Sequence, residues 1–344
     1  MPEITPAAPG EAVPATRPLR HHVTLNDVRR PVEAELDHFH RYFREAMRTD
    51  VGLLDRVIRY VLRQKGKRIR PILVLLSAKV CGGITETSYR GAALVELLHT
   101  ATLIHDDVVD DAERRRGFFS INALWKNKIA VLLGDFLLSR GLLLALDHRD
   151  YDLLHTVSDA VRRMSEGELL QIEKTRHLDI DEATYFRIIS DKTASLISAC
   201  TTCGAISATD DTETIERMRT LGEKLGLAFQ IRDDLFDFGV KDVGKPLGID
   251  LQEKKITLPL IHALREAPAD EQRRILKIVR KKRKSREDIR TVGRFVAERG
   301  GLDYARSRME ALAEEARTLL GAFPPTDARE ALLDLATFIV RRQT

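Results

Sequence analysis

Apolar residues recur at helical intervals through almost the whole chain after Thr24, and this periodicity limits the possible fold more than any other feature. Val28, Val32, Leu36 and Phe39 follow one another at spacings of three and four, which places them on one face of a helix. No alternating apolar and polar run bounded by turn residues indicates a β-hairpin. Aromatic residues make up only 6% of the 344 residues, which also favours helices over β-sandwiches. We therefore expect an all-α fold.

Short breaks such as Gly82-Gly83 separate the predicted helices, and short connections favour one antiparallel bundle. We expect residues 1–22, which hold five of the 12 prolines, to form a disordered leader, and residues 23–344 to form a single all-α domain. The predicted helices span 72–80, 86–109, 121–146, 151–174, 182–208, 211–238, 255–266, 270–283, 286–298, 302–321 and 326–341.

Charge and cysteine content exclude several classes of protein. The chain carries 56 basic and 52 acidic residues, a net charge of +4, so it has no global field for nucleic acid. Its three cysteines are too few for a disulfide framework and indicate a reducing cytoplasm; we interpret Cys200 and Cys203 as packing residues. The longest uncharged run, residues 193–209, is too short and polar to cross a bilayer, and we expect no membrane span.

The pattern Asp-Asp-x-x-Asp occurs twice, with Asp106 and Asp110 as one outer pair and Asp233 and Asp237 as the other. A spacing of four puts each pair on one helix face, about 6 Å apart along the axis. Two like charges there oppose helix formation by a few tenths of a kcal/mol, which a cation would offset. Mg²⁺ binds one or two carboxylates together with substrate phosphates. A solvated acidic face is the alternative, but both copies lie within apolar helical sequence.

Basic residues surround the acidic motifs in the sequence. Lys67 and Arg70 flank the start of a predicted helix, where the N-terminus favours anions. Three arginines, 114–116, follow the first motif, and arginine binds phosphate oxygens in a bidentate manner. His99 precedes Asp106 by seven residues, two helical turns on the same face. Taken singly, such basic residues are usually solvated, and a lone helical histidine usually has its hydrogen bonds satisfied within the fold; together they predict a second, metal-free diphosphate site.

These motifs resemble those of the trans-isoprenyl diphosphate synthases, and of the bacterial long-chain, octaprenyl-type polyprenyl diphosphate synthases in particular. The resemblance extends from about Thr24 to the C-terminus. It implies an isoprenoid-synthase helical bundle around a central cavity, and a homodimer. The matching segments are GKRIRP at 66–71, the stretch 99–110 containing HDDVVD, RRRG at 114–117, GDFLLSRG at 134–141, EGELLQ at 166–171, DKTASL at 191–196, FQIRDDLFD at 229–237 and GKPLGIDLQEKKITLPLI at 244–261.

The resemblance also implies the role of individual residues. Asp106, Asp110, Asp233 and Asp237 would bind Mg²⁺, with three ions present when substrate is bound, and Lys192 would join Asp106, Asp110 and Asp233 as a catalytic residue. The isopentenyl diphosphate site would consist of Lys67, Arg70, His99 and Arg116. The allylic diphosphate site would consist of Arg115, Lys192, Thr193, Gln230, Lys245 and Lys255. The chain departs from the family at Lys254, where glycine is usual, and at Arg114, which extends a pair of arginines to three.

The expected reaction is ionisation of an allylic diphosphate, attack by the isopentenyl double bond and loss of a proton, with magnesium and basic side chains stabilising the leaving diphosphate. Product length depends on packing below Asp106. Ala101 and Thr102 are small where, in this family, aromatic residues stop elongation, and Leu98, Ala145 and Val157 would continue an aliphatic wall. A helix of 24 residues is about 36 Å long, so we expect a product of about 35 to 45 carbons for a quinone side chain. The alternative that these small residues only permit helix packing stays open.

Three other interpretations stay open. A short-chain farnesyl or geranylgeranyl diphosphate synthase would share both acidic motifs, and small Ala101 and Thr102 argue against it. A terpene cyclase would share one motif but would not need the second diphosphate site. The basic run 280–284 could be a solvated face or a contact for RNA or anionic lipid; of these contacts we favour transient peripheral contact at the inner face of the membrane.

Overall fold

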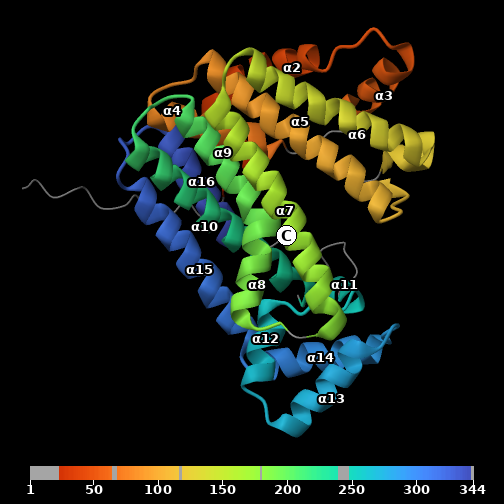
Figure 1. Ribbon diagram of the computed structural model, residues 1–344. Coiled ribbons are helices and arrows are strands. Elements are labelled where there is room, and N and C mark those ends of the chain that lie inside the picture. The colour runs from red at the N-terminus through yellow and green to blue at the C-terminus, as the bar shows by residue number, and fades with distance from the viewer. Residues whose placement is uncertain (1–22, 64–67, 116–117, 179, 239–247, 342–344) are drawn as a thin grey trace, which may run out of the picture.

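The computed structural model describes residues 23–63, 68–115, 118–178, 180–238 and 248–341 (Figure 1). Its described part is almost entirely helical, as the periodicity predicts. The N-terminal half contains α1 (Leu25–Arg29), η1 (Arg30–Val32), α2 (Glu33–Ala46), α3 (Gly52–Arg63), α4 (Ile69–Cys81), α5 (Glu86–Val109), β1 (Arg114–Arg115), β2 (Phe118–Phe119), α6 (Ile121–Asp147) and α7 (Tyr151–His177).

The C-terminal half contains α8 (Glu182–Ile189), η2 (Ser190–Ala194), α9 (Ser195–Ile206), α10 (Thr212–Asp237), α11 (Ile249–Gln252), α12 (Leu258–Arg265), α13 (Ala269–Arg280), α14 (Arg286–Glu298), α15 (Gly301–Leu320) and α16 (Asp327–Arg341). The helices α13 and α14 lie at the opposite end of the molecule from α2 and α3 (Figure 1).

Three expectations need correction. The chain does contain a strand pair, β1 and β2, which is antiparallel and only two residues long on each side. The helix predicted over 182–208 is divided by η2, a π-helical turn in which the hydrogen bonds shift by one residue. The helix predicted to begin at 255 begins at Leu258 instead, with Pro259 in its first turn, a position where the missing N–H costs no hydrogen bond.

The centre of the bundle is formed by α4 and α9, which are buried on nearly all sides. Eight consecutive residues of α4, 71–78, are buried, which is typical of a helix enclosed by others. The two helices approach closely at Gly204, where a Cβ would lie 2.4 Å from the carbonyl oxygen of Val74. Cys200 and Cys203 are free and fully buried on α9, and burial raises the pKa of the Cys200 thiol to about 12. Their interpretation as packing residues is confirmed.

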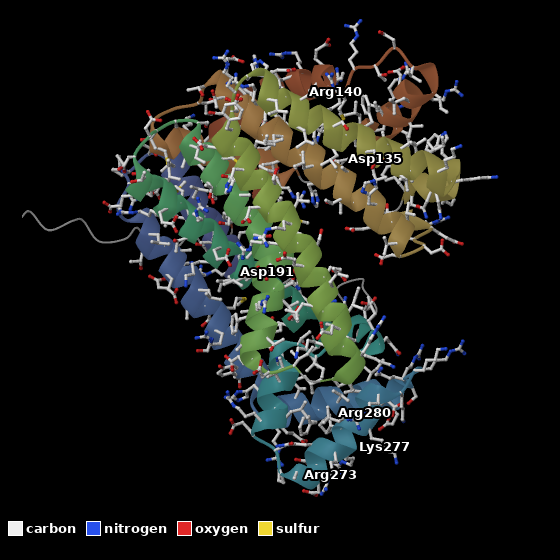
Figure 2. All side chains as sticks on the ribbon, viewed as in Figure 1. Asp135, Arg140, Asp191, Arg273, Lys277 and Arg280 are labelled. Carbon is white, nitrogen blue, oxygen red and sulfur yellow. The ribbon has the colours of Figure 1, made fainter. Side chains whose placement is uncertain are left out.

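The helix α6 packs against α5 but leaves much of its surface uncovered. It is the one described helix long and apolar enough to cross a membrane by length and composition, and only 33% of its most apolar window is buried. Asp135 and Arg140 interrupt that apolar sequence (Figure 2). Its packing against α5 depends on small residues, because a Cβ on Gly141 would lie 2.3 Å from Cδ1 of Leu98.

Candidate active site

The first acidic motif forms the last turn of α5. A capping box between Thr85 and Ser88 begins this helix, which satisfies its first N–H groups, and 24 residues later it ends at Val109. Asp106 and Asp110 are both exposed, whereas Asp107 between them is buried. The N–H of Asp110 donates to the carbonyl oxygen of Asp106 at 2.8 Å, so the two residues lie one helical turn apart, as their spacing predicts.

The second acidic motif forms the last turn of α10 but has different surroundings. Asp233 accepts a hydrogen bond from Nη2 of Arg232 at 2.9 Å. Asp237 faces the start of α11: its Oδ1 accepts from the N–H of Ile249 at 2.8 Å and its Oδ2 from the N–H of Asp250 at 3.2 Å. Burial, and then the neighbouring carboxylate of Asp250, raise the pKa of Asp237, so both disfavour its charged form.

The middle residue of the second motif, Asp234, lies at the centre of a buried hydrogen-bond network. Its Oδ2 accepts from the hydroxyl of Tyr185 on α8 at 2.6 Å, and its Oδ1 accepts from Nε2 of Gln230 at 2.9 Å. Oε1 of Gln230 in turn accepts from the hydroxyl of Thr193 at 2.9 Å. Burial raises the pKa of Asp234 to about 7. Tyr185 is not among the residues predicted from the sequence, since no spacing rule connects α8 to the end of α10.

A pocket of about 160 Å³ opens beside this network. It brings together four of the six residues expected at the allylic diphosphate: Lys192, Thr193, Gln230 and Lys255. Its full lining consists of Gln171, Thr175, Ile180, Tyr185, Ile188, Ile189, Lys192, Thr193, Gln230, Asp234, Asp250, Lys255, Ile256 and Thr257. Residues from five separate helical segments therefore converge on one cavity.

Each of the two lysines in the pocket is held by carboxylates. Nζ of Lys192 forms an ion pair with Glu168 on α7 and lies 3.3 Å from Oε1 of Gln171. Nζ of Lys255 lies 2.6 Å from Oε2 of Glu253 and 3.6 Å from Oδ1 of Asp250. Both lysines are partly exposed, so an anion that enters the pocket can replace these carboxylates as the partner of each ammonium group.

The turn before Lys255 forms although Lys254 replaces the glycine usual in the family. Lys254 adopts φ = 61°, the left-handed region that costs a residue with a Cβ roughly 1–2 kcal/mol. Hydrogen bonds from Lys254 N to Leu251 O at 3.0 Å and from Lys255 N to Asp250 O at 2.9 Å close the turn after α11. Lys254 in place of glycine therefore raises the free energy of this turn, but the turn still forms.

The residues expected at the isopentenyl diphosphate are described only in part. Arg70 lies half-buried in the first turn of α4, and His99 is buried on α5. Lys67 and Arg116 lie outside the described residues, as does Lys245 of the allylic set, and for Arg115 only the backbone is described. The predicted grouping of this second site therefore stays a prediction.

The residues expected to set product length lie among three helices. Leu98 and Ala101 on α5, Ala145 on α6 and Val157 on α7 are all buried. Thr102 is partly buried, and its hydroxyl donates to the carbonyl oxygen of His99 at 2.9 Å. Their burial is compatible both with a tunnel wall and with simple helix packing, so their role stays a prediction.

The four outer aspartates fit a metal ion that is shared with a substrate. Both pairs end a helix, where the negative end of the macrodipole adds to their mutual repulsion. Among the described residues, no group of three or more acidic, histidine or cysteine side chains could hold a metal by itself. This donor set suits Mg²⁺, which completes its shell with phosphate oxygens and water.

Comparison with known proteins places the chain among prenyl diphosphate synthases. Residues 51–296 match the family model described as polyprenyl synthetase. Octaprenyl diphosphate synthase from Escherichia coli (strain K12) is 37% identical over 300 residues, covering 87% of this chain and 93% of that protein.

Solved structures give the same result. A decaprenyl diphosphate synthase from Rhodobacter capsulatus superposes with a TM-score of 0.87 at 33% identity, covering 93% of this chain and all of that one. A polyprenyl synthase from Caulobacter crescentus CB15, complexed with calcium and isoprenyl diphosphate, superposes with a TM-score of 0.83 at 33% identity, covering 94% of this chain and 100% of that one.

Proposed function

We propose that this chain, which belongs to the polyprenyl synthetase family, makes a long all-trans polyprenyl diphosphate. It is a trans-prenyltransferase that uses isopentenyl and allylic diphosphates. The proposed product has about 35 to 45 carbons, the length that a helix of about 36 Å can enclose, and serves as a quinone side chain. The observation that carries the proposed reaction is the pocket where Lys192, Thr193, Gln230 and Lys255 meet beside the second acidic motif, and the small residues Ala101 and Thr102 support the proposed length.

In this proposal the pocket binds the allylic diphosphate. Lys192 and Lys255 neutralise the charge that develops on the leaving diphosphate, and the Thr193 hydroxyl orients one of its oxygens. Asp106, Asp110, Asp233 and Asp237 would hold Mg²⁺. When bound, the metal polarises the phosphate oxygens and so stabilises the leaving group. The Caulobacter polyprenyl synthase is complexed with calcium and isoprenyl diphosphate, which supports a divalent cation here.

The pocket also has apolar walls that suit a carbocation. Ile180, Ile188, Ile189 and Ile256 line it beside the polar residues. These side chains would exclude the water that quenches an allylic cation. The isopentenyl diphosphate would bind at Lys67, Arg70, His99 and Arg116.

Product analysis tests the proposed length. The purified protein is supplied with farnesyl diphosphate, labelled isopentenyl diphosphate and Mg²⁺, and the dephosphorylated products are separated by size. The small Ala101 and Thr102 support a product beyond 20 carbons, whereas accumulation of products with 15 or 20 carbons alone would establish the short-chain alternative. Hydrocarbon release from farnesyl diphosphate without isopentenyl diphosphate would instead indicate a cyclase.

We also propose that the protein forms a homodimer through α6. The exposed apolar residues of this helix, each at least 41% exposed, support a second copy as the covering surface; they are Leu124, Val131, Leu132, Leu143 and Leu146. Sedimentation analysis of the protein and of Leu132→Glu tests this. A monomer in the variant and a dimer in the parent support the interface, and a monomeric parent contradicts it.

Finally, we propose that a cytoplasmic enzyme contacts the inner membrane surface through α13 and α14 when its long product leaves. Arg273, Lys277 and Arg280 lie exposed along α13 (Figure 2). Lys284, the last residue of the run 280–284, is buried and cannot contact a membrane; its Nζ donates to the carbonyl oxygen of Lys281 at 3.0 Å. Co-sedimentation with phosphatidylglycerol vesicles should weaken with salt and in the variant Arg280→Gln/Lys282→Gln/Arg283→Gln. Equal binding to phosphatidylcholine vesicles contradicts an electrostatic contact.

A further inference from the structure

Two helices approach the π-turn η2 so closely that each has a glycine at the contact. On α7, a Cβ at Gly167 would lie 2.9 Å from Cβ of Asp191 and 2.9 Å from N of Lys192. On α10, a Cβ at Gly226 would lie 2.5 Å from Cα of Ala194. Because these distances are shorter than real contacts, η2 is enclosed between two helices that leave it little room. Turns of this kind are rare and are frequently found at functional sites.

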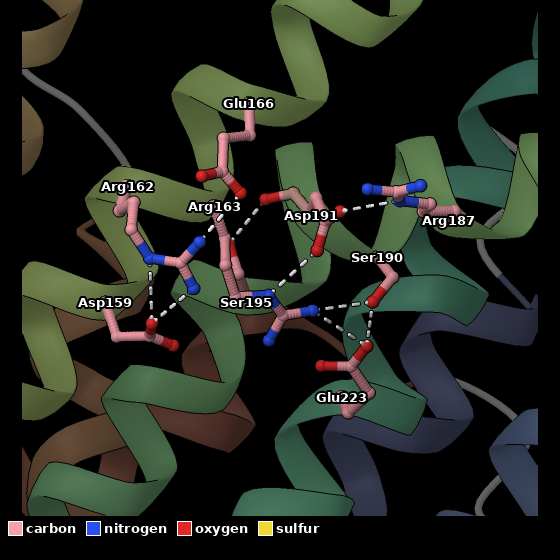
Figure 3. Close-up of polar contacts among 9 residues, drawn as sticks. All are labelled: Asp159, Arg162, Arg163, Glu166, Arg187, Ser190, Asp191, Ser195 and Glu223. Carbon is pink, nitrogen blue, oxygen red and sulfur yellow. Dashed lines mark hydrogen bonds and ion pairs between the residues drawn. The ribbon is translucent and has the colours of Figure 1, made fainter.

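Charged side chains of the same two helices grip the turn, each about one helical turn before its glycine. Arg163 on α7 donates from Nε to Oδ1 of Asp191 and from Nη2 to Oγ of Ser190, both at 2.8 Å. The Ser190 hydroxyl donates to the carboxylate of Glu223 on α10, and Nη2 of Arg163 lies 3.7 Å from that carboxylate. We call these four residues, Arg163, Ser190, Asp191 and Glu223, the turn clamp; Figure 3 shows them together.

The turn clamp and the substrate pocket lie on different sides of η2. Lys192 and Thr193 line the pocket beside Gln230. Arg163, Glu223 and Ser195 instead line a separate groove of about 240 Å³ between α7, α9 and α10. The clamp therefore has no direct access to a diphosphate in the substrate pocket, and any effect it has on substrate passes through the backbone of η2.

The clamp is built to hold one geometry. Side chains of Arg163, Asp191 and Glu223 are 28%, 17% and 25% exposed, so solvent only partly screens their interactions. An arginine fork that bonds two consecutive residues fixes the direction of the turn as well as its position. A misplacement of about 1 Å at a reacting centre can cost roughly 10²-fold in rate.

We propose that the turn clamp holds η2 in its π conformation and thereby aims Lys192 and Thr193 at the allylic diphosphate. Arg163 and Glu223 are then positioning residues for the reaction. This inference rests on the allylic role proposed above for Lys192 and Thr193.

Two variants with a matched control test the clamp. In Arg163→Met and Glu223→Leu, we expect kcat/KM for the allylic diphosphate to fall about 10- to 100-fold, with KM for isopentenyl diphosphate changed less than about twofold. Glu223→Gln keeps an acceptor for Ser190 and should restore most of the activity, which also covers a Leu variant that folds poorly. The control is Arg162→Met, because Arg162 pairs with Asp159 and Glu166 of its own helix (Figure 3); we expect it to change neither constant by more than about twofold.

A double-mutant cycle with Lys192→Ala separates the clamp proposal from the proposed allylic role of Lys192. If the clamp acts through Lys192, Arg163→Met should cost much less in the Lys192→Ala background than in the parent. Affinity for a non-hydrolysable farnesyl thiodiphosphate, measured by calorimetry, should show the same non-additivity. The clamp proposal is overturned if Arg163→Met lowers kcat/KM by the same factor in both backgrounds. It is also overturned if the variant raises KM equally for both substrates. An unchanged kcat/KM for the allylic diphosphate in Lys192→Ala alone would overturn the proposed role of Lys192, and with it the part of the clamp proposal that acts through Lys192.

Discussion

The two acidic motifs have the same spacing and both end a long helix, yet the structure treats them differently. At the end of α5, Asp106 and Asp110 are exposed to solvent. At the end of α10, the carboxylate of Asp234 is buried against Tyr185, and Asp237 accepts two N–H groups from the start of α11. The motif at α5 is therefore the open ligand surface of our proposal, whereas the motif at α10 is also a structural connection.

The largest expected effect would show that both ends share one catalytic task. Asp106→Asn and Asp233→Asn should each lower kcat about 10²- to 10³-fold, since each would weaken the binding of the Mg²⁺ that stabilises the leaving diphosphate. Steady-state condensation of labelled isopentenyl diphosphate measures this, and excess chelator should abolish the parent's activity. Asp111→Asn, one residue beyond the first motif, is the control. Activity of either variant within about threefold of the parent would separate that motif from catalysis.

The second effect concerns only the acidic motif at the end of α10, which we call the buried end because Asp234 is buried there. Burial raises the pKa of Asp234 to about 7 from an unfolded value near 3.8. Between these values the folded protein binds more protons than the unfolded chain, so the free energy of unfolding falls as pH rises. Between pH 5 and 7 this contribution should fall by about 2 kcal/mol as an upper limit.

Urea unfolding of the metal-free protein, with chelator present, measures this pH dependence. In Asp234→Asn the titrating group is absent and an acceptor for Tyr185 is kept, so its stability should vary less over the same range. Parallel pH profiles for the parent and the variant would show that Asp234 does not titrate in this window.

The sequence predicts what the two acidic motifs share, their helical placement, better than it predicts how their surroundings differ. The shared helix face of Asp106 and Asp110 and the packing role of Cys200 and Cys203 follow from local spacing, because a helix converts spacing into a face. The contact of Tyr185 with Asp234 joins positions 49 residues apart. Such a contact depends on how α8 packs against α10, which no local pattern encodes.

The π-turn at Ser190–Ala194 was missed for a related reason. Its residues have ordinary helical spacing on both sides, so the periodicity of 182–208 predicts one uninterrupted helix. What distinguishes the turn is the close approach of Gly167 and Gly226 and the bonds from Arg163. These come from two other helices, and a single glycine or arginine within a helical pattern has many commoner explanations.

A third, smaller effect tests whether the buried end is structural. Asp237→Ala removes the acceptor for the N–H groups of Ile249 and Asp250. Gly248 at the N-cap position of α11 has no side chain to accept these groups, so Asp237 takes the part that an N-cap side chain would play. Losing such an acceptor costs about 1 kcal/mol, so the free energy of unfolding of the metal-free protein should fall by that amount. An unchanged urea midpoint would show that α11 does not depend on Asp237.

The smallest effect has the opposite sign and completes the comparison. Asp110 is exposed at the C-terminal end of α5, where a carboxylate opposes the macrodipole and repels Asp106 four residues earlier. Asp110→Asn should therefore raise the free energy of unfolding of the metal-free protein by about 0.3–1 kcal/mol at low ionic strength, and less at high salt. Urea unfolding at two salt concentrations measures both. The opposite signs of Asp110→Asn and Asp237→Ala are what distinguish an open ligand surface from a structural connection; a loss of stability in Asp110→Asn would mean that the first motif, too, supports the fold.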